Sequence, residues 1–446
     1  MHKKSNDSKL DEAYKNSLKF SILDGAFFSL MMGFGEYYLS AYILLLGATS
    51  FEIGIFGTLP AFFASVVQIW APNLMHHFRS RKKTILAVSW VRTIIWLAII
   101  FAWLMKSISV EIVTLATSIY FSMIFIGSVP WTSWMGDLVD DKERNRYFAV
   151  RNRISTAMMV IGIVIGGIIL QYFENQNLTG FIIIFIAAFI FSAASVLFLS
   201  KKQDVLYIEN LKDELNLKEF TRNITKNNFG KFTIYNTILN FALYIASPFF
   251  IAYQIKILNM NYIEIMVAQA AFLSAKVLFF KAWGIVTDKY GNVKVLSLST
   301  ILVSLLPFLW FYAHTAVQVY LINIFSGIAW AGFELLAFNY IYENVEPQKI
   351  GKFTSYMTFY KGFGILLGGL AGTILFFNNT NFSETFFGIL FISGFFRIIS
   401  SIYFMREVSG NKDHKPWKYG GMMFELLMSA PKEGLNIITV FTRKKK

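Results

Sequence analysis

Residues 180–199 read GFIIIFIAAFIFSAASVLFL, twenty consecutive residues without a charged side chain. About 20 apolar residues in a helix are enough to cross the hydrocarbon core of a bilayer, so this stretch predicts a membrane-spanning helix. The segment from Phe20 to Leu46 is also predominantly apolar. It is longer than the apolar region of about 7–15 residues in a signal peptide, and we expect it to remain as a first span.

Apolar stretches of this kind recur along the whole chain. The candidate spans lie at roughly 20–46, 52–75, 84–105, 111–136, 154–172, 180–199, 232–258, 263–286, 295–313, 317–342, 354–377 and 384–405. Twelve such helices would use about 240 residues of the 446 in the chain. Hydrophobic residues make up 55% and charged residues only 15%, against roughly 25% charged in soluble proteins. The sequence predicts an all-α polytopic membrane protein of twelve transmembrane helices in two six-helix bundles.

Composition also excludes several classes of function. The net charge of +14 indicates a cytoplasmic membrane surface rather than a nucleic acid as partner. The absence of cysteine excludes disulfides and thiolate chemistry, and five histidines, including the adjacent His76 and His77, argue against a zinc centre. No phosphate-binding loop of the G-x-x-x-x-G-K-[ST] type occurs, which argues against an ATP-driven pump. We predict no catalytic residues, no metal and no cofactor, and therefore no enzyme.

Basic residues predict the topology, because lysines and arginines near span ends are retained in the cytoplasm. They concentrate in the N-terminal tail and in the loops after the second and fourth spans: Lys3, Lys4, Lys9, Lys15, Lys19; Arg79, Arg81, Lys82, Lys83; Lys142, Arg144, Arg146, Arg151, Arg153. The alternate loops around 47–51, 106–111 and 173–179 hold only Lys106. Both termini are therefore predicted in the cytoplasm, and the composition favours a bacterial plasma membrane.

The polar stretches divide the chain into five parts. We predict a cytoplasmic tail (1–19), a six-helix bundle (20–200), a cytoplasmic linker (201–231), a second six-helix bundle (232–406) and a basic cytoplasmic tail (407–446). The linker suits either a short amphipathic helix on the inner leaflet or a solvated connection. In the tail, the apolar run from Met422 to Met428 is too short to span, so it either rests on the membrane or belongs to a partly disordered tail.

The two halves share weak internal similarity. An offset of 212 places Glu52-Ile53 on Glu264-Ile265 and Lys82 on Lys294, in loops after the first and second helices of a six-helix unit. A second pair, at an offset of 202, consists of glycines in the fifth helix of each half. These are Gly162, Gly166 and Gly167, and Gly364, Gly368 and Gly369. Glycines four apart let two helices approach closely, so we expect them to be packing positions.

The loop after the eighth predicted span reads Gly284-Ile-Val-Thr-Asp288-Lys289-Tyr290-Gly291-Asn292-Val-Lys294. It resembles the signature loop of the major facilitator superfamily, G-x-x-x-D-[RK]-x-G-x-[RK]-[RK]. The twelve-helix plan in two halves also resembles that family over nearly the whole membrane part. The loop after the second span departs from the signature, because His76 stands in place of the aspartate and Arg79 in place of a glycine.

The resemblance implies a secondary transporter whose two bundles alternate access to a central site. Gly284, Asp288, Lys289 and Gly291, with His76 and Arg79 in the first half, would belong to a cytoplasmic gate. A carboxylate just past a helix end, as predicted for Asp288, can meet a neighbouring helix N-terminus or a cation and hold that side closed. An ordinary turn explains Asp and Gly equally. Helices four and five lack the arginine and the Gly-Pro pair typical of drug/proton antiporters in the family.

Ionisable residues inside spans are costly and suggest functional sites. Six lie deep on these boundaries: Glu36, Arg92, Lys276, Glu334, Lys361 and Arg397. We attribute Asp24, Lys281 and Glu343, nearer the cytoplasmic ends, to snorkelling or capping. The deep cations either neutralise the carboxylates as structural pairs or attract an anionic or zwitterionic substrate. Gln68 and Trp131 are further pathway candidates, and helix–helix contact or interfacial anchoring explains them as well.

We therefore expect a transporter that moves a small organic molecule as a symporter or antiporter. Proton coupling needs a buried carboxylate whose pKa is displaced towards neutrality, and Glu36 and Glu334 are the candidates, with Asp24 third. Two alternatives remain: a transporter-like sensor that binds ligand without moving it, and a polytopic enzyme acting on lipid. The predicted partners are a small-molecule substrate, a proton and membrane lipid. The sequence indicates neither the oligomeric state nor the direction of transport.

Overall fold

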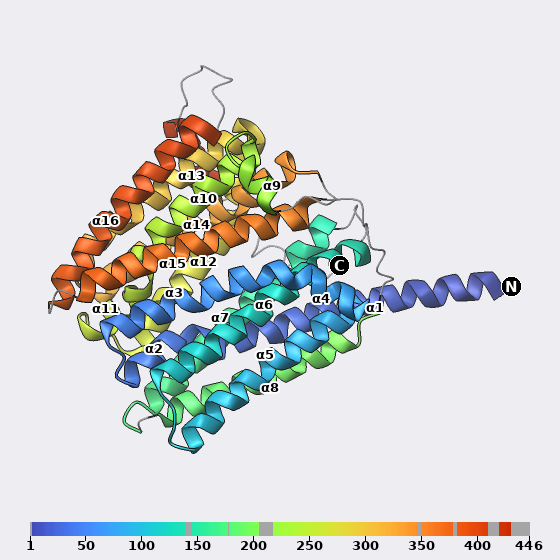
Figure 1. Ribbon diagram of the computed structural model, residues 1–446, viewed down its shortest axis with the longest axis horizontal. Coiled ribbons are helices and arrows are strands. Elements are labelled where there is room, and N and C mark those ends of the chain that lie inside the picture. The colour runs from blue at the N-terminus through green and yellow to red at the C-terminus, as the bar shows by residue number, and fades with distance from the viewer. Residues whose placement is uncertain are drawn as a thin grey trace, which may run out of the picture. The chain divides into compact units, whose positions relative to one another are not determined.

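The computed structural model describes residues 2–139, 144–176, 178–204, 217–346, 349–377, 381–408 and 419–429. All regular elements in these ranges are helical, and twelve helices are long and apolar enough to cross a membrane (Figure 1). The predicted fold class and number of spans are confirmed. The part of the linker at 205–216 and most of the C-terminal tail, including Arg443 to Lys446, lie outside the described residues.

The twelve spans are built from fifteen of the sixteen numbered α-helices and short connecting turns. The six spans of the first half are α1 (His2–Phe34) with α2 (Leu39–Leu45), α3 (Ser50–Val67) with α4 (Ala71–Phe78), α5 (Arg81–Leu104), α6 (Val110–Leu138), α7 (Arg144–Tyr172) and α8 (Thr179–Ser200). After α9 (Leu217–Arg222) come α10 (Asn228–Ala246) with α11 (Phe250–Lys256), α12 (Tyr262–Tyr290), α13 (Asn292–Leu309), α14 (Ala316–Asn344), α15 (Ile350–Phe377) and α16 (Phe382–Tyr403). The helix of the first span begins at His2, so it continues through the described part of the tail that we expected at 1–19.

The chain forms two compact units. The first comprises residues 1–214, 248–255 and 261–266, and the second comprises 215–247, 256–260 and 267–446. In the first unit α1 packs against α7 and α8, while α5 packs against α6 and α8. In the second unit α10 packs against α15 and α16, while α13 packs against α14 and α16. Corresponding helices therefore pack in the same way in both units. The internal repeat found in the sequence is thus also present in the helix packing. The predicted domain boundaries at 200/201 and 231/232 stay predictions.

The first span of each half is interrupted at corresponding positions. A 3₁₀ turn at Glu36–Tyr38 separates α1 from α2, and a 3₁₀ turn at Ser247–Phe249 separates α10 from α11. Gly35 precedes the first interruption and lets the Trp96 ring approach closely, because a Cβ there would lie 2.4 Å from that ring. Such turns expose backbone groups and commonly mark functional positions within helices. The offset of 211 residues is close to the 212 of the sequence repeat.

The glycines of the fifth helix in each half lie at close helix contacts. A Cβ at Gly162 would lie 2.9 Å from the carbonyl oxygen of Leu30 on α1, and a Cβ at Gly364 would lie 2.3 Å from that of Thr237 on α10. A side chain at either position would push the two helices apart. The contacts α1–α7 and α10–α15 therefore require residues without a Cβ at these points.

The turns after the second helix of each half use a left-handed backbone. Gly291 has φ 85° and ψ 149°, a conformation that is essentially restricted to glycine, and it ends α12 and begins α13. Arg79, at the corresponding place in the first half, has φ 48° and ψ 24°. The first-half turn therefore also has a positive φ, although an arginine stands where the second half has a glycine, and this strains the backbone.

We expect opposite changes in stability from exchanging residues at these two turns. Gly291→Ala should lower the free energy of unfolding by about 1–3 kcal/mol, because only glycine adopts this backbone without strain. Arg79→Gly should raise it by roughly 1 kcal/mol, because the left-handed penalty disappears. Thermal unfolding in detergent measures both. A Gly291→Ala protein as stable as the wild type would contradict the strain argument.

Candidate functional site

The interruption of the first span carries a carboxylate inside the first unit. Glu36 begins the 3₁₀ turn, and its Oε2 atom accepts a hydrogen bond of 2.9 Å from the hydroxyl of Tyr120 on α6. Tyr120 is buried and stacks edge-on against Trp96 of α5. The predicted pathway residue Glu36 is thus held between three helices by a neutral donor, at a point where backbone hydrogen bonding is interrupted.

Arg92 on α5 is a cation near Glu36 and Tyr120. Its guanidinium is buried, lies 4.5 Å from the ring centre of Phe28, and is within electrostatic reach of Asp24 and Glu36. Among the residues that the structure describes, its Nε atom has no hydrogen-bond partner. Arg92 is therefore a buried cation within electrostatic reach of two carboxylates, and among the described residues it forms no direct ion pair with either.

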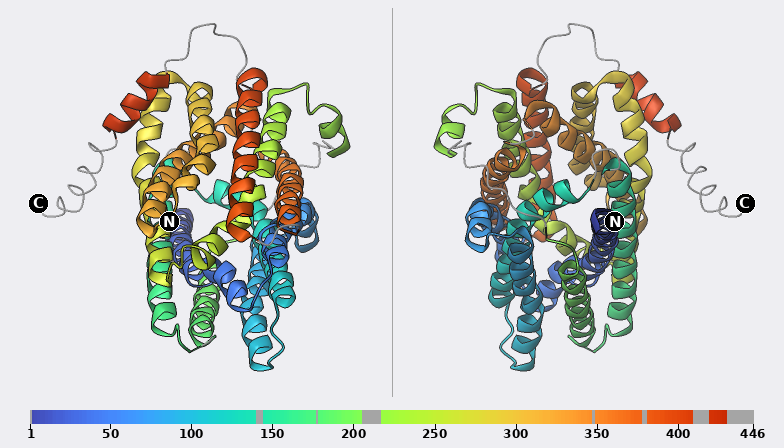
Figure 2. Two further views of the ribbon diagram at one scale, coloured as in Figure 1. Left: turned by 90° about the vertical axis from the view of Figure 1, so that its left-hand side faces the viewer. Right: turned by 90° about the vertical axis from the view of Figure 1, so that its right-hand side faces the viewer.

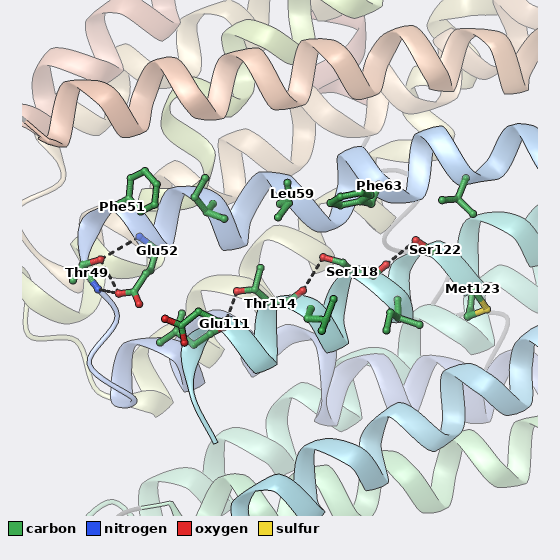
Figure 3. A pocket seen from close by; sticks show the side chains of 15 residues that line it. Thr49, Phe51, Glu52, Leu59, Phe63, Glu111, Thr114, Ser118, Ser122 and Met123 are labelled. Atoms are coloured by element: carbon green, nitrogen blue, oxygen red, sulfur yellow. Dashed lines mark hydrogen bonds between the residues drawn. The ribbon is translucent and has the colours of Figure 1, made fainter. Parts of the chain in front are cut away.

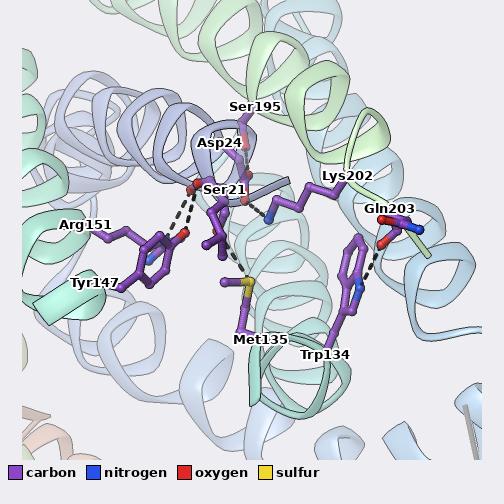
Figure 4. A network of polar contacts seen from close by, with 10 residues as sticks. Ser21, Asp24, Trp134, Met135, Tyr147, Arg151, Ser195, Lys202 and Gln203 are labelled. Carbon is purple, nitrogen blue, oxygen red and sulfur yellow. Dashed lines mark hydrogen bonds and ion pairs between the residues drawn. The ribbon is translucent and has the colours of Figure 1, made fainter. Parts of the chain in front are cut away.

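Asp24 is the third charged residue of this group. We attributed it to snorkelling or capping, and that prediction is wrong. Asp24 is buried rather than snorkelling, and its Oδ2 atom lies 2.9 Å from the ammonium of Lys202 (Figure 4). Ser195 of α8 donates a hydrogen bond of 2.8 Å to the other carboxylate oxygen. Burial lowers the pKa of Lys202, and the attraction of Asp24 opposes that shift. The pair ties α1 to the segment just after α8.

Aromatic and basic side chains surround the pair. Lys202 lies 5.4 Å from the ring centre of Trp134, whose indole N–H donates to the Gln203 carbonyl at 3.1 Å. On the other side of α1, Arg151 donates to the Ser21 carbonyl at 3.2 Å (Figure 4). The Arg151 guanidinium also lies 4.5 Å from the ring centre of Trp131. Trp131 therefore holds Arg151 against α1, which is a packing contact rather than a demonstrated pathway position.

The second unit contains its own charged group on three helices. Lys276 of α12 pairs with Glu334 of α14 at 2.6 Å, and Lys361 of α15 is within electrostatic reach of the same carboxylate. The ring centres of Phe272 and Phe280 lie 6.0 Å and 5.9 Å from the Lys276 ammonium. The group holds two cations and one carboxylate, so it keeps a positive excess.

Two other predicted pathway residues make packing contacts. Arg397 on α16 is buried and donates to the Val303 carbonyl of α13 at 3.3 Å. Gln68, in the 3₁₀ turn between α3 and α4, donates to the Ser128 hydroxyl of α6 at 3.3 Å. Each contact joins two helices of one unit. The structure does not bring Arg397 or Gln68 into contact with the groups around Glu36 or Glu334.

The predicted gate loop differs from expectation in one respect. Asp288 lies in the last turn of α12 rather than past its end, because the helix continues to Tyr290 and stops only at Gly291. Its neighbour Lys289 pairs with Glu425 of the helix at 419–429. Gly284 lies within α12 with open space where a Cβ would be. In the first half His76 and Arg79 are both exposed, at the end of α4 and just after it.

A groove of about 750 Å³ between α3 and α6 was not predicted (Figure 3). Its walls are apolar, with Leu59 and Phe63 on one side and Leu115 on the other, and Glu52 and Glu111 lie at one end. The hydroxyls along α6 donate to carbonyls of their own helix. Apolar residues in a span are equally explained by lipid contact, so no feature of the sequence singles out this groove.

Comparisons with known proteins agree with this architecture. Residues 232–442 match the family model described as Major Facilitator Superfamily. No match is found among curated protein sequences.

Solved structures resemble nearly the whole chain. A mutant of the nucleoside transporter NupG superposes with a TM-score of 0.66 at 16% identity, covering 87% of this chain and 99% of the other. An inward-facing bacterial homologue of the iron transporter ferroportin gives 0.64 at 14% identity, with coverage of 90% and 100%. A bacterial homologue of the human lysosomal transporter Spinster gives 0.62 at 12% identity, with coverage of 91% and 98%.

The twelve apolar helices define a multi-pass membrane protein, and its fold is similar to that of solved transporter structures. The resemblance to the major facilitator superfamily is confirmed, by the family model in the second half and by the shared fold over the whole membrane part.

Proposed function

We propose that this protein is a secondary active transporter that moves a small organic molecule by alternating access and couples its movement to protons. The observation that carries the proposal is the position of Glu36. A carboxylate lies at an interrupted span, accepts a hydrogen bond from buried Tyr120, and has Arg92 nearby. A group in such a place can exchange a proton when access changes, because burial and a nearby cation act on its charge in opposite directions.

The charged group of the second unit supports an anionic or zwitterionic substrate. Lys276 and Lys361 outnumber Glu334, and a cation in a low-dielectric site attracts an anion strongly. Lys276 keeps about a fifth of its side chain exposed. A substrate carboxylate or phosphate can therefore compete with Glu334 for Lys276, and Glu334 would then be free to take up a proton.

The location follows from the charge pattern. We propose a bacterial plasma membrane with both termini in the cytoplasm, since the basic loops around Lys82 and Arg151 alternate with nearly uncharged ones. Asp288, Lys289 and the altered first-half loop with His76 would then face the cytoplasm. In this orientation the Asp24–Lys202 pair also lies at the cytoplasmic end of the first unit.

Uptake and efflux in proteoliposomes test the proposal. A panel of mono- and dicarboxylates, zwitterionic amino acids and a nucleoside is driven by an imposed pH gradient. Glu36→Gln should lose gradient-driven accumulation by roughly tenfold or more, while exchange of substrate against substrate continues, because glutamine resembles the protonated carboxylate. Glu264→Gln, at a partly exposed helix-capping carboxylate, is the matched control.

The same vesicles separate the remaining alternatives. Loss of anion movement alone in Lys276→Ala supports the anion site, whereas equal loss for every substrate indicates a purely structural ion pair. Ligand binding without movement in the wild type would replace the transporter proposal with the sensor alternative. Turnover of vesicle lipid would revive the enzyme alternative.

A further inference from the structure

The short helix at residues 419–429 has two apolar faces, of which one is buried and the other is exposed. One face enters the core of the second unit, where Met422 and Leu426 are fully buried together with Val286 of α12 and Val295 of α13. Figure 2 shows this helix in red against the end of the yellow α12. The packing alone gives the helix a fixed place at the α12–α13 turn.

Polar contacts strengthen this attachment. Glu425 pairs with Lys289, the basic residue of the signature loop, and this hydrogen bond lowers the pKa of Glu425. The hydroxyl of Tyr419 lies 3.2 Å from that of Ser297 on α13. Glu425 is the only charged side chain of the helix at 419–429 and is engaged with α12, so the opposite face carries no charge.

That opposite face is apolar and open. Phe424, Leu427 and Met428 are 64%, 54% and 52% exposed, and they share one side of the helix at spacings of three and four residues. Three adjacent large apolar side chains on a water-facing helix would be unfavourable. The helix contacts Lys289 in the last turn of α12, so it lies at the end of a span, where a bilayer would have its interface.

The flanking sequence carries the complementary charge. Trp417, a residue type enriched at membrane interfaces, comes two positions before the helix. The segments on either side are basic: Lys412, Lys415 and Lys418 precede the helix, and Lys432, Arg443, Lys444, Lys445 and Lys446 follow it. An apolar helix face bordered by basic segments is the pattern that binds an anionic lipid surface.

We propose that residues 419–429 form an interfacial helix that inserts Phe424, Leu427 and Met428 into an anionic lipid leaflet. Its inner face holds the α12–α13 turn through Met422, Leu426 and the Glu425–Lys289 pair. The helix therefore joins the lipid surface to the signature loop of the second half. This inference concerns lipid contact alone and stands or falls independently of substrate transport.

The absence of cysteine allows a direct test on the full chain. An environment-sensitive fluorophore is attached to Leu427→Cys in vesicles of phosphatidylglycerol and phosphatidylcholine, or of phosphatidylcholine alone. Phe391→Cys, on the exposed apolar side of α16, reports the bilayer interior, and Glu384→Cys, exposed at the start of α16, reports a loop end. Quenching by iodide measures contact with water, and quenching by spin-labelled lipid measures contact with the bilayer.

Spin-labelled lipid should quench the Leu427 label. Iodide should quench the Leu427 label much less than it quenches the Glu384 label. Protection from iodide should be stronger with phosphatidylglycerol and should weaken at high salt, because the flanking cations are screened. Iodide quenching equal to that of the Glu384 label in both vesicles would overturn the proposal. Protection from both quenchers would also overturn it, because it would mean that protein covers this face. Identical quenching in the two lipid mixtures would overturn it as well.

Discussion

Lys202→Met is expected to lower the free energy of unfolding by about 3–5 kcal/mol, because it leaves the buried Asp24 carboxylate without its cation. The ammonium of Lys202 is completely buried and lies 2.9 Å from Asp24. Among the residues that the structure describes, the Ser195 hydroxyl alone would remain to hydrogen-bond the carboxylate directly. Thermal and denaturant unfolding in detergent, followed by tryptophan fluorescence, measure the change.

The adjacent lysine supplies a matched control. Lys201 is exposed and only borders the rings of Phe20 and Phe198, so Lys201→Met should change stability by less than about 1 kcal/mol. The double variant Asp24→Asn with Lys202→Met removes both charges and should recover most of the loss, since a neutral pair has no uncompensated charge. If Lys202→Met were as stable as Lys201→Met, the buried pair would not hold α1 to the segment after α8.

The spans could be predicted closely because apolar length is a local property of the sequence. The charge-free stretch at 180–199 corresponds to α8 within a residue at each end. The error at Asp288 is also local. A hydropathy pattern ends where polar residues begin, whereas the helix continues until Gly291, whose positive φ ends it.

The charged groups could be predicted only in part, because pairing depends on contacts distant in sequence. Lys202 is 178 residues from Asp24, and a position near a span end does not reveal such a partner. Counting charges did suggest that some cations neutralise carboxylates, and Lys276 with Glu334 is such a pair. Which cation meets which carboxylate required the helix packing of each unit.

The broken first span had no signal strong enough for prediction. Gly35 and Glu36 are one glycine and one carboxylate inside an apolar segment, and the close approach of Trp96 and Ala188 explains the glycine. Comparison with Pro248 in the second half would have been informative, since proline interrupts helices by removing a hydrogen-bond donor. The internal repeat therefore holds more structural information than its few matching residues suggest.

Gly368→Ala is expected to destabilise the second unit by about 3 kcal/mol, because an added methyl group would force α10 and α15 apart. A Cβ at Gly368 would lie 2.1 Å from the Phe241 carbonyl oxygen, and Gly364 and Gly372, one turn to either side, are equally close to Thr237 and Ile245. The obstacle at each position is backbone, which cannot rotate away as a side chain can. Strain therefore spreads along the whole contact.

Gly351→Ala, in the same helix, should increase stability rather than lower it. Gly351 is exposed with open space where a Cβ would be, so alanine should gain up to about 1 kcal/mol from its higher helix propensity. The comparison separates close packing from helix propensity, since both variants replace glycine by alanine within α15. Equal effects of the two substitutions would mean that α10 and α15 tolerate a wider separation, and that the glycine spacing does not determine how the helices of this unit approach.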